Sequence, residues 1–234
     1  MKIAHLSDLH CGAKDISEEL IADMFAQVVL SGADVLVITG DLTESGIGSE
    51  YEMLRAGLVK CQAAGMKILS VPGNHDVAWR GVGSYDDARA DAMDDLPSDW
   101  SRALWPRLYE RIVGLSSSLG QRNELMPHLA RGEVGNLQMA RLKALGTNRF
   151  DVLLLHHHPL WHDRFLLLED AIQLNKLILG MQFKLVLFGH RHEYFRRKIG
   201  YVWYVGAGCT TRERWFEIWD VPTVGQVRVQ RRAF

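Results

Sequence analysis

Five groups of polar residues in this chain have the types and spacing of metal ligands, and each group follows a short apolar run. They are Asp8 with His10, Asp41, Asn74 with His75, the histidine triplet 156–158, and His190 with His192. In α/β proteins, ligands bind beyond the carboxyl ends of the strands. Asp8 and His10 are two residues apart, so we expect both side chains on one face of an extended chain. The five groups predict one polar site at the ends of successive strands.

The donor types indicate which ions such a site would hold. Carboxylate, amide and imidazole donors without thiolate suit manganese, iron, zinc or similar ions better than a soft metal. With one histidine of the triplet, the candidate set is too large for one tetrahedral ion. It suits two ions that share a bridging carboxylate, at the separation of about 3.5–4 Å that is typical of two-metal hydrolases.

Alternating strands and helices are expected to position these residues. Helical spacing of apolar residues predicts helices at 18–30, 51–64, 137–145 and 165–179. Apolar runs predict strands at 2–7, 33–39, 66–71, 151–155 and 183–188. The tail changes character, and 201–205, 214–219 and 227–231 read as antiparallel strands separated by glycine and proline turns.

The rhythm of strands and helices breaks at 79–131. This segment predicts a helical insertion, because a series of large apolar residues in it has helical spacing: Trp100, Leu104, Trp105, Leu108 and Ile112. Two interpretations stay open for the insertion. It is either a lid over the site or an ordinary helical pair packed on the edge of the sheet.

Composition limits the class of protein. A chain of 234 residues with ligands spread from end to end favours a single domain at 1–234, and 47% apolar residues are ample for a core. Lys plus Arg is 27 and Asp plus Glu is 28, which is unlike the basic balance of dedicated DNA-binding proteins. We expect no membrane span and no signal peptide, because no apolar run is long enough and a strand begins at once. Three scattered cysteines indicate a reducing cytoplasm.

These motifs together resemble the calcineurin-like metallophosphoesterases. The resemblance covers nearly the whole chain and is carried, in order, by Asp8-x-His10, Gly40-Asp41, Gly73-Asn74-His75-Asp76, His157 and Gly189-His190-x-His192. The opening His-Leu-Ser-Asp-Leu-His, the 135–145 helix with Gln138 and the His-His-Pro turn resemble the bacterial class III cyclic nucleotide phosphodiesterase branch. The resemblance implies an α/β fold, a four-layer αββα sandwich with two facing mixed β-sheets. We expect the tail strands to supply the second sheet.

The resemblance also implies a role for each residue. Asp8, His10 and His192 would hold the first metal ion. Asn74, His157 and His190 would hold the second, and Asp41 would bridge the two ions. A hydroxide activated by the metals would attack phosphorus. His75 would protonate the leaving oxygen or stabilise the transition state, and Asp76 would orient His75.

The histidine triplet requires a choice among three neighbours. The family pattern puts the ligand two residues before Pro159, which selects His157. His156 would then face the opposite way, as a core histidine or as support for a ligand, and His158 would lie at the rim of the pocket. We expect His5 to be a core histidine and Cys11 to be a packing residue.

The function that the resemblance implies is hydrolysis of phosphodiester bonds in small nucleotides, such as cyclic nucleotides or related diesters, with two Mn, Fe or Zn ions as cofactors. Three alternatives share the fold. A DNA nuclease is disfavoured because the chain is short and near neutral. A phosphomonoesterase stays open, because the metals and His75 serve both reactions. A non-enzymatic binding scaffold is disfavoured because every expected ligand is present.

Overall fold

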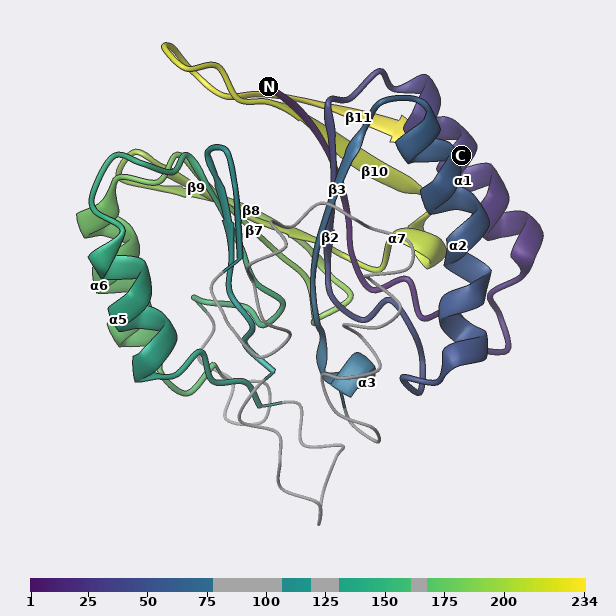
Figure 1. The fold of residues 1–234 in the computed structure, drawn as a ribbon, viewed down its shortest axis with the longest axis horizontal. Helices are drawn as coiled ribbons and strands as arrows, with labels where there is room; N and C mark the ends of the chain where they lie inside the picture. The colour runs from purple at the N-terminus through teal and green to yellow at the C-terminus, as the bar shows by residue number, and fades with distance from the viewer. Residues whose placement is uncertain (78–106, 119–130, 161–167) are drawn as a thin grey trace.

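The structure, a computed structural model, describes residues 1–77, 107–118, 131–160 and 168–234. Within these ranges two mixed β-sheets face each other, and a pair of helices covers the outer face of each sheet (Figure 1). The predicted αββα sandwich is confirmed. The N-terminal strand lies in the first sheet, between strands that come from opposite ends of the chain.

The first sheet has the strand order β11-β10-β1-β2-β3. Its strands are β1 (Lys2–Leu6), β2 (Val35–Thr39), β3 (Lys67–Val71), β10 (Trp215–Asp220) and β11 (Arg228–Ala233). The first three run parallel, whereas β10 is antiparallel to both β1 and β11. Helices α1 (Glu18–Leu30) and α2 (Gly48–Ala63) connect the parallel strands and cover the outer face. The Ser17 hydroxyl caps α1 by accepting from the backbone N–H of Leu20.

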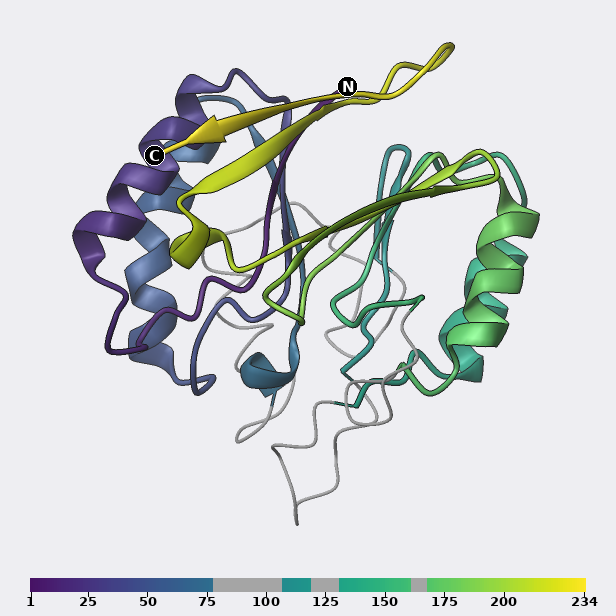
Figure 2. The ribbon, with the colours of Figure 1, turned by 180° about the vertical axis from the view of Figure 1, so that it is seen from behind.

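The second sheet has the order β4-β5-β6-β7-β9-β8. Its strands are β4 (Arg107–Tyr109), β5 (Ile112–Gly114), β6 (Val152–Leu154), β7 (Leu185–Phe188), β8 (Tyr194–Ile199) and β9 (Val202–Ala207). The four inner strands are parallel and the two edge strands antiparallel. Helices α5 (Asn136–Ala144) and α6 (Ala171–Met181) cover its outer face (Figure 2).

The apolar core lies in layers between these elements. One cluster fills the space between the sheets and under α1 and α2, where Ile3 and Leu36 share a core with Val152 and Leu185 of the second sheet. A second cluster lies between the second sheet and its helices and includes Leu142. Both faces of the parallel strands are covered by apolar layers, so residues pointing to either side are buried. This is why these strands read as continuous apolar runs in the sequence.

Two expectations about the elements are wrong. Leu108 and Ile112 lie in a β-hairpin rather than a helix, because Ile112 pairs with Val152 and Arg111 forms an ion pair with Asp151. The rest of the predicted helical insertion, at 79–106 and 119–130, lies outside the described residues. The tail strands also divide between the sheets: β8 and β9 join the second, and β10 and β11 extend the first.

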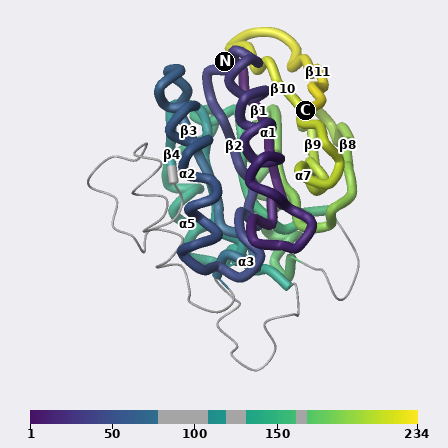
Figure 3. The backbone as a smooth tube through the Cα atoms, turned by 90° about the vertical axis from the view of Figure 1, so that its right-hand side faces the viewer, coloured from purple at the N-terminus to yellow at the C-terminus, as the bar shows by residue number. Residues whose placement is uncertain are grey.

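In the described ranges no helix combines the length and the apolar character that a bilayer crossing requires. The short helix α3 (Asn74–Val77) follows the end of β3 and lies near the lower end of the molecule, whereas α7 (Thr210–Glu213) lies higher, with the N–H of Thr210 donating to the carbonyl of Ser7 after β1 (Figure 3).

Candidate metal centre

All five predicted groups of ligands meet at one end of the sandwich. The parallel strands β1, β2 and β3 and the facing strands β6 and β7 end on the same side of the molecule (Figure 2). Each contributes its first polar residues beyond the strand. The prediction that strand ends assemble a single polar site is confirmed by this convergence.

The backbone at the ligands is left-handed rather than extended. Among the described residues, nine non-glycine residues have positive φ, and five of them are predicted ligands: Asp8 (54°), His10 (48°), Asp41 (48°), His190 (78°) and His192 (55°). The argument from an extended chain at Asp8 and His10 is therefore wrong, although the two side chains do meet. Left-handed conformations at non-glycine residues concentrate at functional sites. Hydrogen bonds hold them here, with Asp8 N–H donating to the carbonyl of Gly40 and His10 N–H to that of Asp41, each at 3.0 Å.

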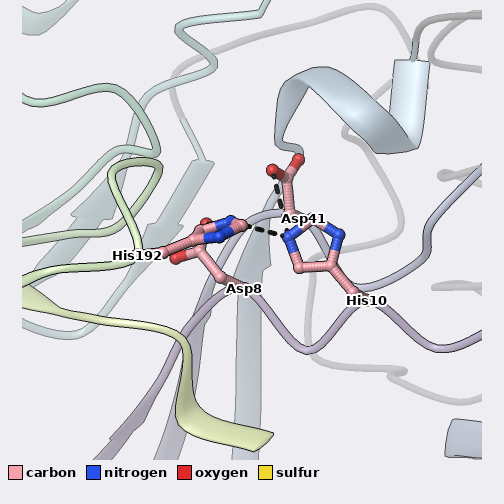
Figure 4. Close-up of side chains that lie close together, drawn as sticks. All are labelled: Asp8, His10, Asp41 and His192. Atoms are coloured by element: carbon pink, nitrogen blue, oxygen red, sulfur yellow. Dashed lines mark hydrogen bonds and ion pairs between the residues drawn. The ribbon is translucent and has the colours of Figure 1, made fainter. Parts of the chain in front are cut away.

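A first donor group consists of Asp8, His10, Asp41 and His192 (Figure 4). One ligand atom from each lies within 4.8 Å of all the others. His10 Nε2 is 2.8 Å from His192 Nε2, and His192 Nε2 is 3.4 Å from Asp8 Oδ1. These residues come from the loops after β1, β2 and β7, so the group spans both sheets.

A second donor group shares Asp41 with the first. It contains Asp41, His156 and His190, and Asn74 completes it. Asn74 Oδ1 is 3.0 Å from both His156 Nε2 and His190 Nδ1, and those two nitrogens are 3.1 Å apart. Asp41 Oδ2 is 3.3 Å from His156 Nε2. Asp41 is the only residue common to both groups, as the bridging role predicts.

His156 Nε2 belongs to the second group, so the expectation that His156 faces away is wrong. His157, the expected ligand, lies beside that group: its ring centroid is 4.3 Å from that of His190, and its Nε2 is buried with no hydrogen-bond partner in the described part of the chain. The ring of His157 turns toward Gly132 and contacts the Ser117 hydroxyl through Nδ1 at 2.8 Å. The direction of each side chain in the triplet depends on the turn after β6 and on the contact with Ser117, which spacing from Pro159 does not show.

Two glycines allow the loops to approach this closely. A Cβ on Gly73 would lie 2.1 Å from Asp41 Oδ1, and one on Gly189 would lie 2.2 Å from Asp8 Oδ2. The glycines of the Gly-Asn-His and Gly-His-x-His motifs are therefore required for packing against the carboxylates.

The hydrogen bonds of His156 and His10 show that the donor set fits metal ions: one ring nitrogen of each is bonded to the protein, and the other faces other donor atoms of the site. His156 Nδ1 contacts the carbonyl of Thr39 at 2.8 Å and must donate to it, which leaves an Nε2 lone pair facing the oxygen of Asn74. His10 Nδ1 likewise contacts the Glu44 carboxylate at 2.8 Å, which leaves its Nε2 facing His192 Nε2. Contacts of about 3 Å between lone pairs are those of ligands about 2.1 Å from a common ion.

The electrostatics agree with a site for positive charge. Burial would raise the pKa of Asp41, but His156 above all, with His75 and His10, holds it well below its usual range. Burial would lower the pKa of His156, but the charge of Asp41 raises it to about 9. A proton on His156 and a metal ion are alternative sources of positive charge beside Asp41, and Nε2 presents its lone pair only when the ring is neutral.

His75 lies beside both groups. Its backbone N–H donates to Asp41 Oδ1 at 2.9 Å, and its Nδ1 contacts the carbonyl of Glu44 at 2.7 Å. Asp76 does not orient it, contrary to the prediction. The Asp76 carboxylate instead accepts from the backbone N–H groups of Thr43 and Gly73 and from the Thr43 hydroxyl. Asp76 therefore ties the loop of Asp41 to the loop of Asn74.

Glu44 is a residue that the sequence analysis missed. Its carboxylate accepts from Nδ1 of His10, and its carbonyl holds the ring of His75. A carboxylate on the second nitrogen of a histidine ligand fixes the tautomer and the ring orientation. The only signal in the sequence was its position three residues after Asp41, which is too common a spacing to carry a prediction.

The remaining histidines have packing roles. His5 is fully buried, and its Nε2 contacts the Thr39 hydroxyl at 2.9 Å, as expected of a core histidine. His158 is buried against the rings of Phe188 and Phe195 rather than at a rim. Cys11 is buried and free, and burial raises the pKa of its thiol, which agrees with a packing role.

The sequence profile of calcineurin-like phosphoesterases matches residues 1–194. The chain belongs to the calcineurin-like phosphoesterase family. This phosphoesterase is 29% identical over 224 residues to a 3′,5′-cyclic-nucleotide phosphodiesterase of Nostoc sp., an alignment that covers 90% of this chain and 78% of the relative. It is 30% identical over 213 residues to a cAMP/cGMP dual specificity phosphodiesterase of Mycobacterium tuberculosis, with 81% and 61% covered. The predicted resemblance to bacterial cyclic nucleotide phosphodiesterases is confirmed.

For several relatives the alignment covers only part of the relative's length. A 3′,5′-cyclic adenosine monophosphate phosphodiesterase of Escherichia coli matches at 27% identity over 169 residues, which is 68% of this chain but 54% of the relative. Among solved structures, a dimetal phosphatase from Danio rerio has a TM-score of 0.62 at 12% identity, with 98% of both chains covered. At that identity the likeness shows the fold alone.

Proposed function

We propose that this phosphoesterase uses two metal ions to hydrolyse the cyclic diester of small nucleotides. The observation that carries the proposal is the pair of donor groups that share Asp41, each with ligand atoms about 3 Å apart at the carboxyl ends of the strands. Two ions held around one carboxylate would form the symmetric clamp that stabilises both the attacking and the leaving oxygen of an in-line displacement.

Each residue has a proposed role in this site. Asp8, His10 and His192 hold the first ion, and Asn74, His156 and His190 hold the second, with Asp41 contacting both. When bound, the ions supply Lewis-acid stabilisation of charge on the phosphoryl oxygens and lower the pKa of a bound water. We propose Mn, Fe or Zn as the ions, because the donors are oxygen and imidazole.

His75 is proposed as the residue that donates to the leaving oxygen. The carbonyl of Glu44 takes its Nδ1–H, so only Nε2 is left to face the leaving oxygen, and it can donate there only when the ring is the doubly protonated imidazolium. The backbone bond to Asp41 holds that ring at the edge of both groups. Opening a cyclic nucleotide releases a ribose alkoxide, a poor leaving group that gains most from a proton donor. The names of the relatives support this substrate class. We propose a cytoplasmic location because Cys11, Cys61 and Cys209 are all free thiols, as in a reducing compartment.

The test is a substrate screen with protein reconstituted with manganese. Cyclic AMP and cyclic GMP are compared with dinucleotides, glycerophosphodiesters and single-stranded DNA, and bis(p-nitrophenyl) phosphate is compared with p-nitrophenyl phosphate. The proposal expects the highest kcat/KM on a cyclic nucleotide and preference for the diester of the nitrophenyl pair. Higher activity on the monoester, or on DNA, would contradict it.

The bridging carboxylate gives a second test of the same proposal. Asp41→Ala should lose tight binding of both ions as well as activity, since it is the only residue in both groups. Metal content is measured by mass spectrometry after gel filtration. A variant that keeps two ions, or one ion with intact activity, would refute the shared centre.

A further inference from the structure

The hydroxyl of Ser117 lies at the base of the loop that carries the histidine triplet. Ser117 follows β5 and is fully buried. Its Oγ contacts three atoms of that loop: the backbone nitrogen of His157 at 3.1 Å, that of His156 at 3.3 Å, and His157 Nδ1 at 2.8 Å. A single side chain from a distant part of the sequence therefore contacts both candidate ligands.

Counting protons fixes the direction of each bond. A backbone N–H can only donate, so Ser117 Oγ accepts from both His156 and His157 and both of its lone pairs are used. Its one proton must then go to His157 Nδ1. In the neutral ring of His157 this puts the proton on Nε2, which is buried and has no hydrogen-bond partner among the described residues. The contact with Ser117 therefore occupies Nδ1 and leaves Nε2 without an acceptor.

His156 has the opposite tautomer. Its Nδ1 donates to the carbonyl of Thr39 at 2.8 Å, so its Nε2 lone pair faces Asn74 and His190. Which nitrogen of a histidine can bind a metal is set by the hydrogen bond that the other nitrogen makes. The two neighbouring histidines thus differ in their contacts: His156 Nε2 faces the second donor group, whereas His157 Nδ1 is occupied by Ser117.

We propose that Ser117 is a positioning residue that selects His156 over His157 as ligand of the second ion. The hydroxyl oxygen of Ser117 accepts from two backbone N–H groups of the loop, and its hydroxyl proton is donated to His157 Nδ1. The proposal deepens the proposed function and depends on it, because selection matters only if the second group holds an ion.

Ser116 provides a matched control. It is the preceding residue, it is equally buried, and its hydroxyl has no hydrogen-bond partner within the described part of the chain. Its backbone is held instead by Gln138, whose side chain bonds both its N–H and its carbonyl. Ser116→Ala therefore removes a buried hydroxyl of the same size from the same segment without touching the histidines.

The experiment titrates metal-free protein with Mn²⁺ by calorimetry and by electron paramagnetic resonance. In wild type, two ions bind, and the second gives the signal of a coupled pair. In Ser117→Ala, the first ion should bind as in wild type, and the second should bind about 10–100-fold more weakly, the usual loss when a partner that orients a ligand is removed. Ser116→Ala should keep both affinities within about threefold of wild type, since surrounding contacts at the site are unchanged.

A double variant separates positioning from general destabilisation. If Ser117 acts through His156, then Ser117→Ala should cause no further loss of second-ion affinity in a His156→Ala background. Equal weakening of both ions, or additive losses in the double variant, would overturn the proposal. So would wild-type affinities in Ser117→Ala.

The tautomers can be measured in the wild type itself, which keeps the proposal testable if a variant does not fold. Long-range ¹H–¹⁵N spectra of the zinc-loaded protein should show His157 protonated at Nε2 and His156 at Nδ1. His157 with its proton on Nδ1 would overturn the selection by Ser117. Wild type that binds fewer than two ions would overturn the proposed function and this inference together, whereas two ions with unchanged binding in Ser117→Ala would overturn the inference alone.

Discussion

Replacing His75 with alanine should slow the hydrolysis of cyclic nucleotides without removing the metals. The contact between His75 and Asp41 is made by the backbone N–H, which alanine retains. The side chain contributes no atom to either of the two groups that share Asp41, and its own Nδ1 is occupied by the carbonyl of Glu44. The His75 ring also lies with His10 and Glu44 in a third set of donor atoms close enough to hold an ion. The metal content of the variant therefore decides whether His75 is a proton donor or a ligand.

The size of the defect follows from the leaving group. General acid help is worth about 10²–10⁴-fold, which corresponds to about 2.7–5.4 kcal/mol of activation free energy at about 1.36 kcal/mol per factor of ten. A ribose alkoxide needs nearly all of this help. A nitrophenolate leaves without a proton, so the loss on bis(p-nitrophenyl) phosphate should be less than about tenfold.

The assay measures kcat/KM of wild type and His75→Ala on cyclic AMP and on bis(p-nitrophenyl) phosphate, with the metal content of the same samples. A much larger defect on the nucleotide with two ions retained supports proton donation. Equal defects on both substrates would mean that His75 only positions the phosphate. Loss of an ion would make it a ligand and refute the reasoning.

Four further variants test other parts of the structure. His156→Ala should bind one ion more weakly whereas His157→Ala binds both as in wild type, measured by calorimetry, because His156 Nε2 lies in the second group. Glu44→Ala should weaken metal binding about 10–100-fold by freeing Nδ1 of His10, as measured by calorimetry. Burial would raise the pKa of Asp151, but hydrogen bonds and charge from a neighbouring arginine and lysine lower it. It therefore contributes stability that is present above about pH 4 and is lost as pH falls through the lowered value, so urea unfolding of Asp151→Asn should depend less on pH below about 4.

Most of the site could be predicted because it depends on residue type and on strand ends. Asp8, Asp41 and Asn74 each follow a buried apolar run, and parallel strands bring such positions to one edge. The helix at α1 was equally readable, since its buried residues recur at helical spacing after a serine cap. These features are local in sequence and need no knowledge of which strands are neighbours.

The errors share a different cause. His156 and His157 are adjacent, and the hydroxyl that separates their roles comes from 40 residues earlier in the chain. The hairpin containing Ile112 exists because β6 offers it a parallel partner, and β10 joins the first sheet because β1 has a free edge there. Contacts between distant segments decide each case, and spacing along the chain carries no signal of them.

The left-handed ligands connect the fold to the chemistry. Each such residue costs about 1–2 kcal/mol relative to ordinary backbone, and five occur at this one site among the described residues. They persist because the fold fixes them: Asp8 and His10 are bonded to the next loop, and the N–H of His190 donates to both oxygens of Asp8 at 3.0 Å. Each of these bonds joins two protein groups. The fold itself therefore contributes to holding the donor atoms at the site, and it offsets part of the cost of the left-handed backbone.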